Sequence, residues 1–275
     1  MLDKSIRAAD YEKFCRFLEH QCGILLGENK QYLVKSRLSP LLVTFNATSL
    51  SDLINRAMSV RERELRLAVV DAMTTNETLW FRDSYPFNVL GDTILPEFAQ
   101  RTGSLKVWSA AASSGQEAYS IAMTALERQN QLRRPINVRV LGTDISNQMI
   151  AQCKKAEYEP LALARGLSLE RKQRFFEPAE KPGAMRVTSK VRQMVDFRHL
   201  NLLDSYALLG KFDVIFCRNV LIYFSPQNKQ KILNQLAQSL NPNGYLFLGA
   251  SESISGFDSP FKMQRCNPGI VYRLA

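Results

Sequence analysis

Apolar residues recur every three or four positions through the first 75 residues, which is the spacing of amphipathic helices. The stretch "DYEKFCRFLEHQCG" gathers its apolar residues on one face and ends in Gly23, a residue that commonly terminates a helix. The stretch "NKQYLVKSRLSPLLVTF" has the same spacing, and we expect Pro40 to break or kink its helix. "SLSDLINRAM" and "VRERELRLAVVDAMT" continue the pattern without a strand between them. Residues 1–75 are therefore predicted to form a small all-helical domain.

From about residue 105 onwards, short apolar runs alternate with helical segments. The strand candidates are "LKVWSAA", "NVRVLGTD", "VDFRHLNL", "FDVIFCRN" and "GYLFLGAS", and the intervening helices are "QEAYSIAMTALERQ", "SNQMIAQCKKA" and "SPQNKQKILNQLAQSL". Several of these runs are apolar on both faces, as expected of parallel strands covered by helices. The alternation predicts a doubly wound α/β sheet, with "GIVYRLA" as a final strand at its edge.

One stretch interrupts this alternation between about residues 165 and 198. Turn signals at Pro178 and at Pro182-Gly183 separate short β-like runs, which predicts a small antiparallel β insertion at about residues 174–197. The stretch holds nine Lys or Arg residues and four Asp or Glu residues, a net charge of +5. Charge concentrated in this way suits either a docking surface or a solvated loop.

Composition and charge narrow the class of protein. A chain of 275 residues with 45% hydrophobic and 23% charged residues is ordinary for a globular protein with a sizeable core. No apolar run approaches the roughly 18 residues of a membrane span, and the start of the chain lacks an apolar signal core. We therefore expect a cytoplasmic protein without membrane insertion. The net charge of +10 suits an acidic partner, or serves solubility alone.

Cysteine and histidine usage gives no sign of a metal site. The five cysteines are odd in number and form no CxxC pair, which indicates reduced thiols. The two histidines, His20 and His199, are not in ligand spacing with a cysteine pair, so no metal is expected. A catalytic Cys–His pair is disfavoured but stays open.

The stretch "VWSAAASSGQEAYSIAM" predicts a strand, a tight turn of tiny residues and a helix. The N–H groups at the start of such a helix point at whatever binds there. The turn from Ala110 to Gly115 has one glycine and no GxGxxG pattern, which disfavours NAD and FAD because their pyrophosphate needs the closest approach to the backbone. S-adenosylmethionine, which has no phosphates, tolerates the alanines and serines found here.

Polar residues follow three further strands. Asp144 ends the second strand, where it can bind ribose hydroxyls or cap the next helix. Asn201 follows the third strand and suits an adenine edge, and Cys217, Arg218 and Asn219 follow the fourth. Ligands of open α/β sheets bind beyond the carboxyl ends of the strands, so these residues predict one site.

The motifs "TTNETLWFRD", "VWSAAASSGQEAYSIAM", "LGTDIS" and "FDVIFCRNVLIYF" resemble the CheR family, the bacterial chemotaxis-receptor methyltransferases. The resemblance covers nearly the whole chain. It implies a class I methyltransferase sheet in residues 76–275, a receptor-contacting helical domain in residues 1–75, and transfer of a methyl group from S-adenosylmethionine to receptor glutamates. In some members the β insertion docks a receptor tail through a glycine-rich turn. The single glycine of "EPAEKPGAMRV" makes tail-dependent docking doubtful here, although the insertion remains a contact surface.

Carried over motif by motif, the resemblance implies both cofactor-binding and catalytic residues. The implied cofactor-binding residues are Asn76, Thr78, Arg82, Glu117, Asp144, Asn201, Leu202, Cys217, Arg218 and Asn219. The family more often has two adjacent acids after the glycine of its first motif, then a proline. This chain has Gln116, Glu117 and Ala118, so Glu117 is kept as the contact.

The chemistry of a glutamate acceptor suits these residues. A glutamate with a pKa of about 4.3 is already ionised at neutral pH, so alignment can replace a general base. Arg82 is expected to orient the carboxylate, or to pair with Asp83 or Glu77 at the surface. Tyr223 is expected near the sulfonium, or in the core.

Aromatic neighbours and cationic residues complete the picture. Trp80 and Phe81 are expected to be packing residues. The receptor is expected to meet Lys30, Lys35 and Arg37, with a smaller contribution from Arg186, Lys190 and Arg192 of the insertion.

Two other functions stay open: an RNA methyltransferase, and a regulatory module that binds the cofactor without catalysis. Nothing in the chain resembles an RNA-binding module, so no nucleic-acid partner is expected. A monomer is one option for the oligomeric state.

Overall fold

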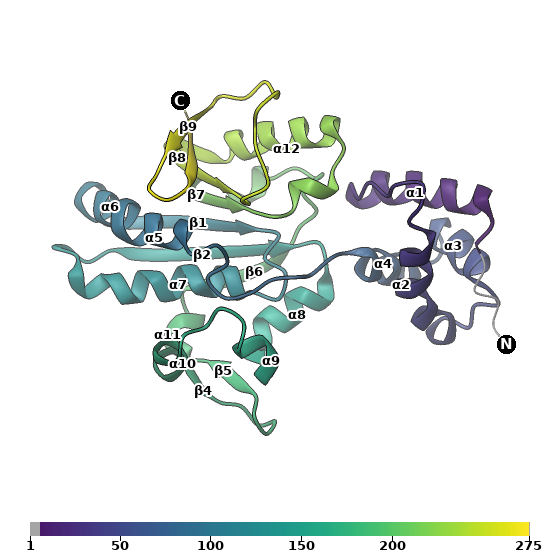
Figure 1. The fold of residues 1–275 in the computed structure, drawn as a ribbon, viewed down its shortest axis with the longest axis horizontal. Helices are drawn as coiled ribbons and strands as arrows, with labels where there is room; N and C mark the ends of the chain where they lie inside the picture. Colours follow the sequence, from purple (N-terminus) through teal and green to yellow (C-terminus); the bar gives the residue numbers. More distant parts are fainter. Residues whose placement is uncertain (1–5, 275) are drawn as a thin grey trace. The chain divides into compact units, whose positions relative to one another are not determined.

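The computed structural model describes residues 6–274 of the chain. The chain divides into two compact units, which are drawn as ribbons in Figure 1. The first contains the described residues up to Thr75 together with Tyr223–Lys229, and the second contains Asn76–Ile222 and the residues from Gln230 onwards.

The first unit is built from four helices, as the spacing of apolar residues predicts. They are α1 (Ala8–Cys22), α2 (Gln31–Thr44), α3 (Leu50–Met58) and α4 (Arg63–Met73). Helix α1 ends at Gly23, whose φ of 77° is favourable only for glycine. Phe14, Leu18, Leu38 and Leu42 are fully buried and form part of the core between the helices.

Helix α2 continues through Pro40 to Thr44, so the expected break at this proline is wrong. Val34, Leu38 and Leu42 lie on both sides of Pro40 and are buried against the other helices. Their burial offsets the one backbone hydrogen bond that a proline cannot donate.

The second unit contains a seven-stranded sheet with the strand order β6-β2-β1-β7-β8-β10-β9. Its strands are β1 (Ser104–Ala110), β2 (Asn137–Asp144), β6 (Val195–His199), β7 (Phe212–Cys217), β8 (Leu240–Leu248), β9 (Phe261–Arg265) and β10 (Ile270–Leu274). The first five pair in parallel, whereas β10 pairs antiparallel with β8 and β9. The carboxyl ends of the five parallel strands therefore lie side by side along the border of the sheet where these strands end, which is its carboxyl edge.

The last strand is not at the edge of the sheet, which corrects the prediction from the sequence. Strand β10 lies between β8 and β9, so β9 is the edge strand. Strand β9 was not predicted because only Phe261 of its five residues is buried. An edge strand with one buried residue has no apolar run by which its sequence could be detected.

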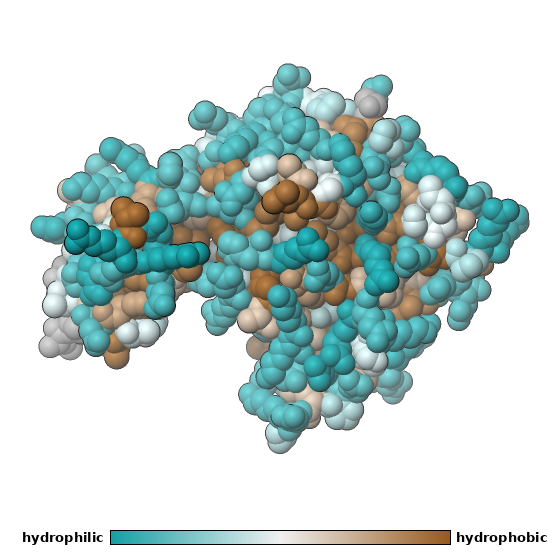
Figure 2. Space-filling view, turned by 180° about the vertical axis from the view of Figure 1, so that it is seen from behind, coloured by the Kyte–Doolittle hydropathy of each residue, from teal (hydrophilic) through white to brown (hydrophobic). Residues whose placement is uncertain are grey.

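Helices cover both faces of the sheet. Figure 1 shows α7 (Gln116–Arg128) and α8 (Asn147–Lys155) on one side and α12 (Pro226–Gln238) on the other. A helical stretch precedes β1, and short 3-10 turns occur between the main elements. These are α5 (Tyr85–Val89), the π-helical η1 (Leu90–Ile94), α6 (Leu95–Arg101), η2 (Gln129–Gln131), η3 (Ala207–Leu209) and η4 (Leu221–Tyr223). In the space-filling view of Figure 2, hydrophilic side chains cover most of the visible surface, as expected of a buried apolar core.

A separate three-stranded antiparallel sheet has the order β3-β5-β4. Its strands are β3 (Glu157–Tyr158), β4 (Phe176–Pro178) and β5 (Met185–Val187), and its helices are α9 (Pro160–Leu163), α10 (Leu169–Phe175) and α11 (Ser189–Arg192). The expected β insertion is therefore present. Its bounds differ from the expected range of 174–197: strand β3 precedes residue 174, and residues 195–197 belong to β6 of the main sheet.

Replacing Gly142 with alanine should destabilise the second unit. A Cβ at this position of β2 would lie 2.5 Å from Cε1 of the buried Phe197. We expect a loss of about 1–3 kcal/mol, typical of overpacking a core, measured by thermal and urea unfolding. The matched control is Gly27→Ala, where an added Cβ meets nothing within 4 Å. Equal unfolding midpoints for the two variants would show that Phe197 moves aside without cost.

Candidate active site

The turn between β1 and α7 is held in an uncommon backbone conformation. Ala111, Ser113 and Gly115 have φ angles of 66°, 51° and 95°, in the left-handed region. The carbonyl of Ser113 accepts a hydrogen bond from Cys153 Sγ at 3.1 Å, and that of Ser114 accepts one from Tyr158 Oη at 2.7 Å. These contacts fix the turn, and with it the N–H groups at the start of α7.

Asp144 ties the same turn to the end of β2. Its Oδ2 accepts a hydrogen bond from the Ser113 backbone N–H at 2.8 Å, and its Oδ1 accepts one from the Ser146 N–H at 2.9 Å. Ser146, rather than Asp144, caps helix α8, because its Oγ accepts a hydrogen bond from Met149 N–H. The buried Asp144 carboxylate is therefore fixed at the carboxyl edge of the sheet.

Glu117 and Arg218 form a buried ion pair next to this turn. Glu117 Oε2 accepts a hydrogen bond from Arg218 Nη1 at 2.8 Å, and Glu117 Oε1 accepts one from Ser109 Oγ at 2.8 Å. Arg218 Nη2 also donates to Asp83 Oδ2 at 2.6 Å and to the Arg82 carbonyl at 2.8 Å. The side chain of Arg218 is 1% exposed. Its guanidinium therefore bonds to three protein groups on two other segments of the chain.

The surroundings of Arg82 differ from the ion pairs considered from the sequence. The Asp83 carboxylate pairs with Arg218, and the Glu77 carboxylate pairs with Arg165 at 3.1 Å. The half-buried Arg82 donates to the Glu77 carbonyl at 3.2 Å. Within residues 6–274 no carboxylate lies within 4.0 Å of the Arg82 guanidinium. Neither acid considered as its partner neutralises it.

The aromatic residues before Arg82 pack in the core, as predicted. Trp80 is fully buried and meets Tyr158 and Phe176 edge-on, with ring centroids 4.8 and 5.2 Å apart. Phe81 is 5% exposed and packs against Phe87 at 5.3 Å. Their burial anchors the segment that carries Arg82.

The predicted residues Asn76, Thr78, Asn201 and Leu202 lie around the same edge of the sheet or on segments joined to it. The Asn76 carbonyl accepts a hydrogen bond from Ser113 Oγ at 2.8 Å, which joins the "NETLWFR" segment to the turn. Thr78 is half-buried on that segment. Leu200 N–H donates to the Asp144 carbonyl at 2.9 Å, which brings Asn201 and the buried Leu202 beside the end of β2.

The turn after β7 is fixed by a residue that was not predicted, Glu252. Glu252 Oε2 accepts hydrogen bonds from the backbone N–H groups of Asn219 and Gly249, both at 2.7 Å. Asn219 has a φ of 57°. The only sequence signal for Glu252 is an acid shortly after the last parallel strand, in "GASES". Glu252 therefore clamps the ends of β7 and β8 together.

Burial makes the thiols near this edge unreactive. Burial raises the pKa of Cys217 well above its ordinary value, and burial also raises the pKa of Cys153. Both thiols remain protonated at neutral pH, so neither is poised as a nucleophile. All five cysteines are free.

Tyr223 and the predicted receptor-contact residues belong to the first unit. The Tyr223 carbonyl accepts a hydrogen bond from Leu25 N–H at 2.8 Å, and its side chain is half-buried. Lys30 and Lys35 are exposed on or beside α2.

Arg37 is engaged within the first unit. Its guanidinium donates to the carbonyls of Met73 and Thr74 at 2.6 and 3.0 Å, and to Thr75 Oγ1 at 2.9 Å. Arg37 therefore ties α2 to the end of α4, where carbonyls lack partners within the helix.

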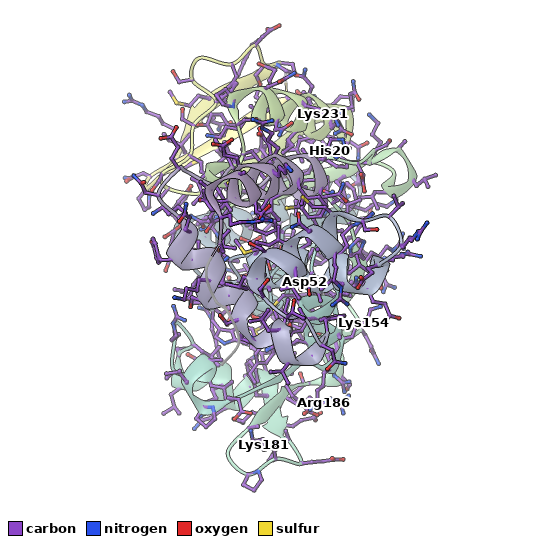
Figure 3. All side chains as sticks on the ribbon, turned by 90° about the vertical axis from the view of Figure 1, so that its right-hand side faces the viewer. His20, Asp52, Lys154, Lys181, Arg186 and Lys231 are labelled. Carbon is purple, nitrogen blue, oxygen red and sulfur yellow. The ribbon has the colours of Figure 1, made fainter. Side chains whose placement is uncertain are left out.

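The cations in and beside the insertion are partly paired. Five of the nine cations from Arg165 to Arg198 have a carboxylate within 4.0 Å. The pairs are Arg165–Glu77, Arg171–Glu127, Lys181–Glu159, Arg192–Glu177 and Arg198–Asp196. Lys181 and Arg186 are labelled on the insertion in Figure 3. These pairs reduce the positive charge that the insertion presents to a partner.

The described part of the chain has neither a cluster of metal-ligating side chains nor a membrane-spanning helix. In residues 6–274 there is no group of three or more His, Cys, Asp or Glu side chains that could hold a metal ion. None of the helices in that range is both long and apolar enough to span a bilayer.

Comparison with known families and proteins gives concordant matches. The family described as "CheR methyltransferase, SAM binding domain" matches residues 76–270, and "CheR methyltransferase, all-alpha domain" matches residues 9–74. The chemotaxis protein methyltransferase of Vibrio parahaemolyticus serotype O3:K6 is 59% identical over 273 residues, which is 98% of each chain. The chemotaxis protein methyltransferase 1 of Vibrio cholerae serotype O1 has the same identity and coverage. That of Escherichia coli K12 is 33% identical over 93% of this chain and 88% of its own.

The sheet order, the acidic carboxyl edge and the tight turn after β1 define a class I methyltransferase that uses S-adenosylmethionine. The chain belongs to the CheR methyltransferase family. The resemblance inferred from its motifs is thereby confirmed.

Proposed function

We propose that this methyltransferase forms methyl esters on glutamate side chains in the methylation region of chemotaxis receptors, in the cytoplasm. S-adenosylmethionine supplies the methyl group and leaves as S-adenosylhomocysteine. Chemotaxis methyltransferases are its relatives at 59% identity. The observation that carries the proposal is Arg82, a half-buried cation whose neighbouring acids are paired elsewhere. Such a cation suits a carboxylate acceptor.

The residues at the carboxyl edge of the sheet fit this cofactor. Asp144 and Glu117 place two carboxylates beside the turn, which disfavours a pyrophosphate by repulsion. The same carboxylates suit hydroxyl and ammonium groups, so Asp144 would hold the ribose and Glu117 would lie toward the amino-acid part. Asn201 and Leu202 would flank the adenine.

Alignment is the main demand of the reaction on this chain. The acceptor carboxylate is ionised at neutral pH, so no residue has to remove a proton. Arg82 would hold the acceptor in line with the methyl group, and Tyr223 would lie near the sulfonium. His20 and His199 are both exposed and take no part.

Replacing Arg82 or Tyr223 should slow the reaction without unfolding the protein. Arg82→Ala and Tyr223→Phe should each lower kcat by about 10- to 100-fold, because a misaligned acceptor loses the benefit of orientation. Turnover is measured as base-labile radiolabel transferred to a panel of receptor signalling domains, and stability by thermal unfolding. Wild-type turnover in either variant would remove that residue from the mechanism. Label appearing on RNA would support the alternative RNA methyltransferase, and no transfer by the wild type would support a non-enzymatic role.

Removing the Asp144 carboxylate should weaken cofactor binding. Asp144→Ala should cost about 1–3 kcal/mol of binding free energy for S-adenosylhomocysteine, measured by calorimetry. Asp144 also accepts two backbone hydrogen bonds, so Asp144→Asn is included because it keeps an acceptor oxygen. The matched control is Asp196→Ala, an exposed acid on β6. Unchanged affinity in both Asp144 variants would take this residue out of the cofactor site.

Receptor binding is proposed to use the exposed lysines of the first unit. Receptor methylation regions are expected to be helices rich in Glu and Gln, which attract a basic surface. Lys30 and Lys35 are exposed, whereas five of the nine cations between Arg165 and Arg198 lie within 4.0 Å of an acid. Arg37 was expected to share this role. Because its guanidinium donates hydrogen bonds to carbonyls at the end of α4, reversing the charge of Arg37 would test the stability of the unit instead of receptor binding.

Reversing the two lysines should raise the receptor KM. Lys30→Glu with Lys35→Glu should weaken receptor binding at low salt and leave cofactor affinity unchanged. The effect should shrink at 0.15 M salt, where screening acts over about 8 Å. The matched control reverses Lys181 and Lys190 on the insertion, both exposed. If the receptor KM changes neither with the Lys30 and Lys35 reversal nor with salt, the positive charge serves solubility and not receptor binding.

A further inference from the structure

The backbone around Arg82 is held in a conformation that it would not adopt unaided. Phe81, Asp83 and Ser84 have φ angles of 49°, 65° and 50°. Left-handed conformations are unfavourable for residues other than glycine, and least so for Asp and Asn. Contacts from other segments must therefore hold this loop in place.

The strongest of these contacts come from Arg218. Its Nη2 donates to both the Arg82 carbonyl and the Asp83 carboxylate, and its Nη1 donates to Glu117. With a side chain 1% exposed, Arg218 depends on these protein groups for its hydrogen bonds. The Asp83 carboxylate thus fixes one arm of the guanidinium, and Glu117 fixes the other.

Phe81, which precedes Arg82 in the chain, is also held by contacts from other segments. The Phe81 N–H donates to Ser120 Oγ at 3.1 Å, and the Phe81 ring lies 3.6 Å beneath the Arg171 guanidinium. Arg171 is held in turn by Glu127 at 2.8 Å. The chain is therefore held on both sides of the Arg82 side chain, at Phe81 and at the Arg82 carbonyl and Asp83.

We propose that Asp83 is a positioning residue for methyl transfer. Its carboxylate acts through Arg218 to fix the backbone of Arg82 relative to Glu117, and so sets where the Arg82 guanidinium lies. The inference rests on the proposed role of Arg82 in orienting the acceptor. In this proposal Asp83 acts through Arg218 and not by contact with the acceptor or the cofactor, so its loss should affect turnover more than binding.

The test compares Asp83→Asn and Asp83→Gly with the wild type. Asn and Gly both tolerate a positive φ, so the two variants remove the Asp83 carboxylate without adding backbone strain. We expect kcat to fall about 10- to 100-fold, the range caused by a displacement of about 1 Å in an aligned site. The receptor KM and the affinity for S-adenosylhomocysteine should change less than about threefold, in the range of small uncoupled effects. Base-labile radiolabel measures turnover, and calorimetry measures affinity.

Two comparisons separate this inference from the function on which it rests. In an Arg82→Ala background, Asp83→Asn should add little further loss, because a residue that acts through Arg82 has nothing left to position. The matched control is Asp92→Asn, because Asp92 also pairs with an arginine, Arg128, at 2.6 Å. This control variant should have the turnover of the wild type.

Each outcome has a distinct meaning. If the Asp83 variants have wild-type kcat while the separate Arg82→Ala variant is impaired, the positioning role alone is overturned. If the Arg82→Ala variant itself has wild-type kcat, the proposed function is overturned. Additive losses in the double variant would also overturn the inference. An equal loss of cofactor affinity and turnover, or a fall in the thermal midpoint that matches the loss of activity, would assign Asp83 a purely structural role and overturn it as well.

Discussion

The buried guanidinium of Arg218 joins the segments from which the candidate site is built. It bonds to the Arg82–Asp83 loop, to the first turn of α7 through Glu117, and it extends from the end of β7. A charge removed from water is tolerated only when it is paired and hydrogen-bonded. Two carboxylates and a carbonyl pair with both Nη atoms, while Nε is buried without a hydrogen-bond partner among the described residues. These bonds give the three segments one mutual arrangement, by which the rest of the site is positioned.

Strained backbone and acidic side chains gather at the same edge of the sheet. Ala111, Ser113 and Asn219 have positive φ angles there, and the Asp144 and Glu252 carboxylates accept hydrogen bonds from adjacent backbone N–H groups. Such conformations persist only where the surrounding structure fixes them, and they concentrate at functional sites. The turn after β1 has alanines and serines where dinucleotide sites have glycines, which accords with a cofactor that has no phosphate.

Charge counted along a sequence differs from charge offered to a partner. The stretch from Arg165 to Arg198 has a net charge of +5, yet five of its nine cations lie against acids, three of which are outside the stretch. Arg37 lies beside two exposed lysines in the helical unit, but it is bonded to the end of α4. Exposure and pairing, rather than the count of basic residues, decide which surface can attract an acidic helix.

The sequence by itself determined the helical first 75 residues, the alternation of strands and helices, and the strand–turn–helix at residues 107–123. These features follow from local periodicity and turn chemistry, which each segment carries within itself. Its motifs also predicted Asp144, Glu117 and Arg218 as site residues, and the structure joins Glu117 to Arg218 and Asp144 to the turn after β1. The tertiary structure alone decided that β10 is internal, that α2 continues through Pro40, that Asp83 bonds to Arg218 and that Glu252 bonds to the turn after β7. Each of these depends on a partner distant in the sequence: Asp83 meets Arg218 across 135 positions, and no local pattern records that contact.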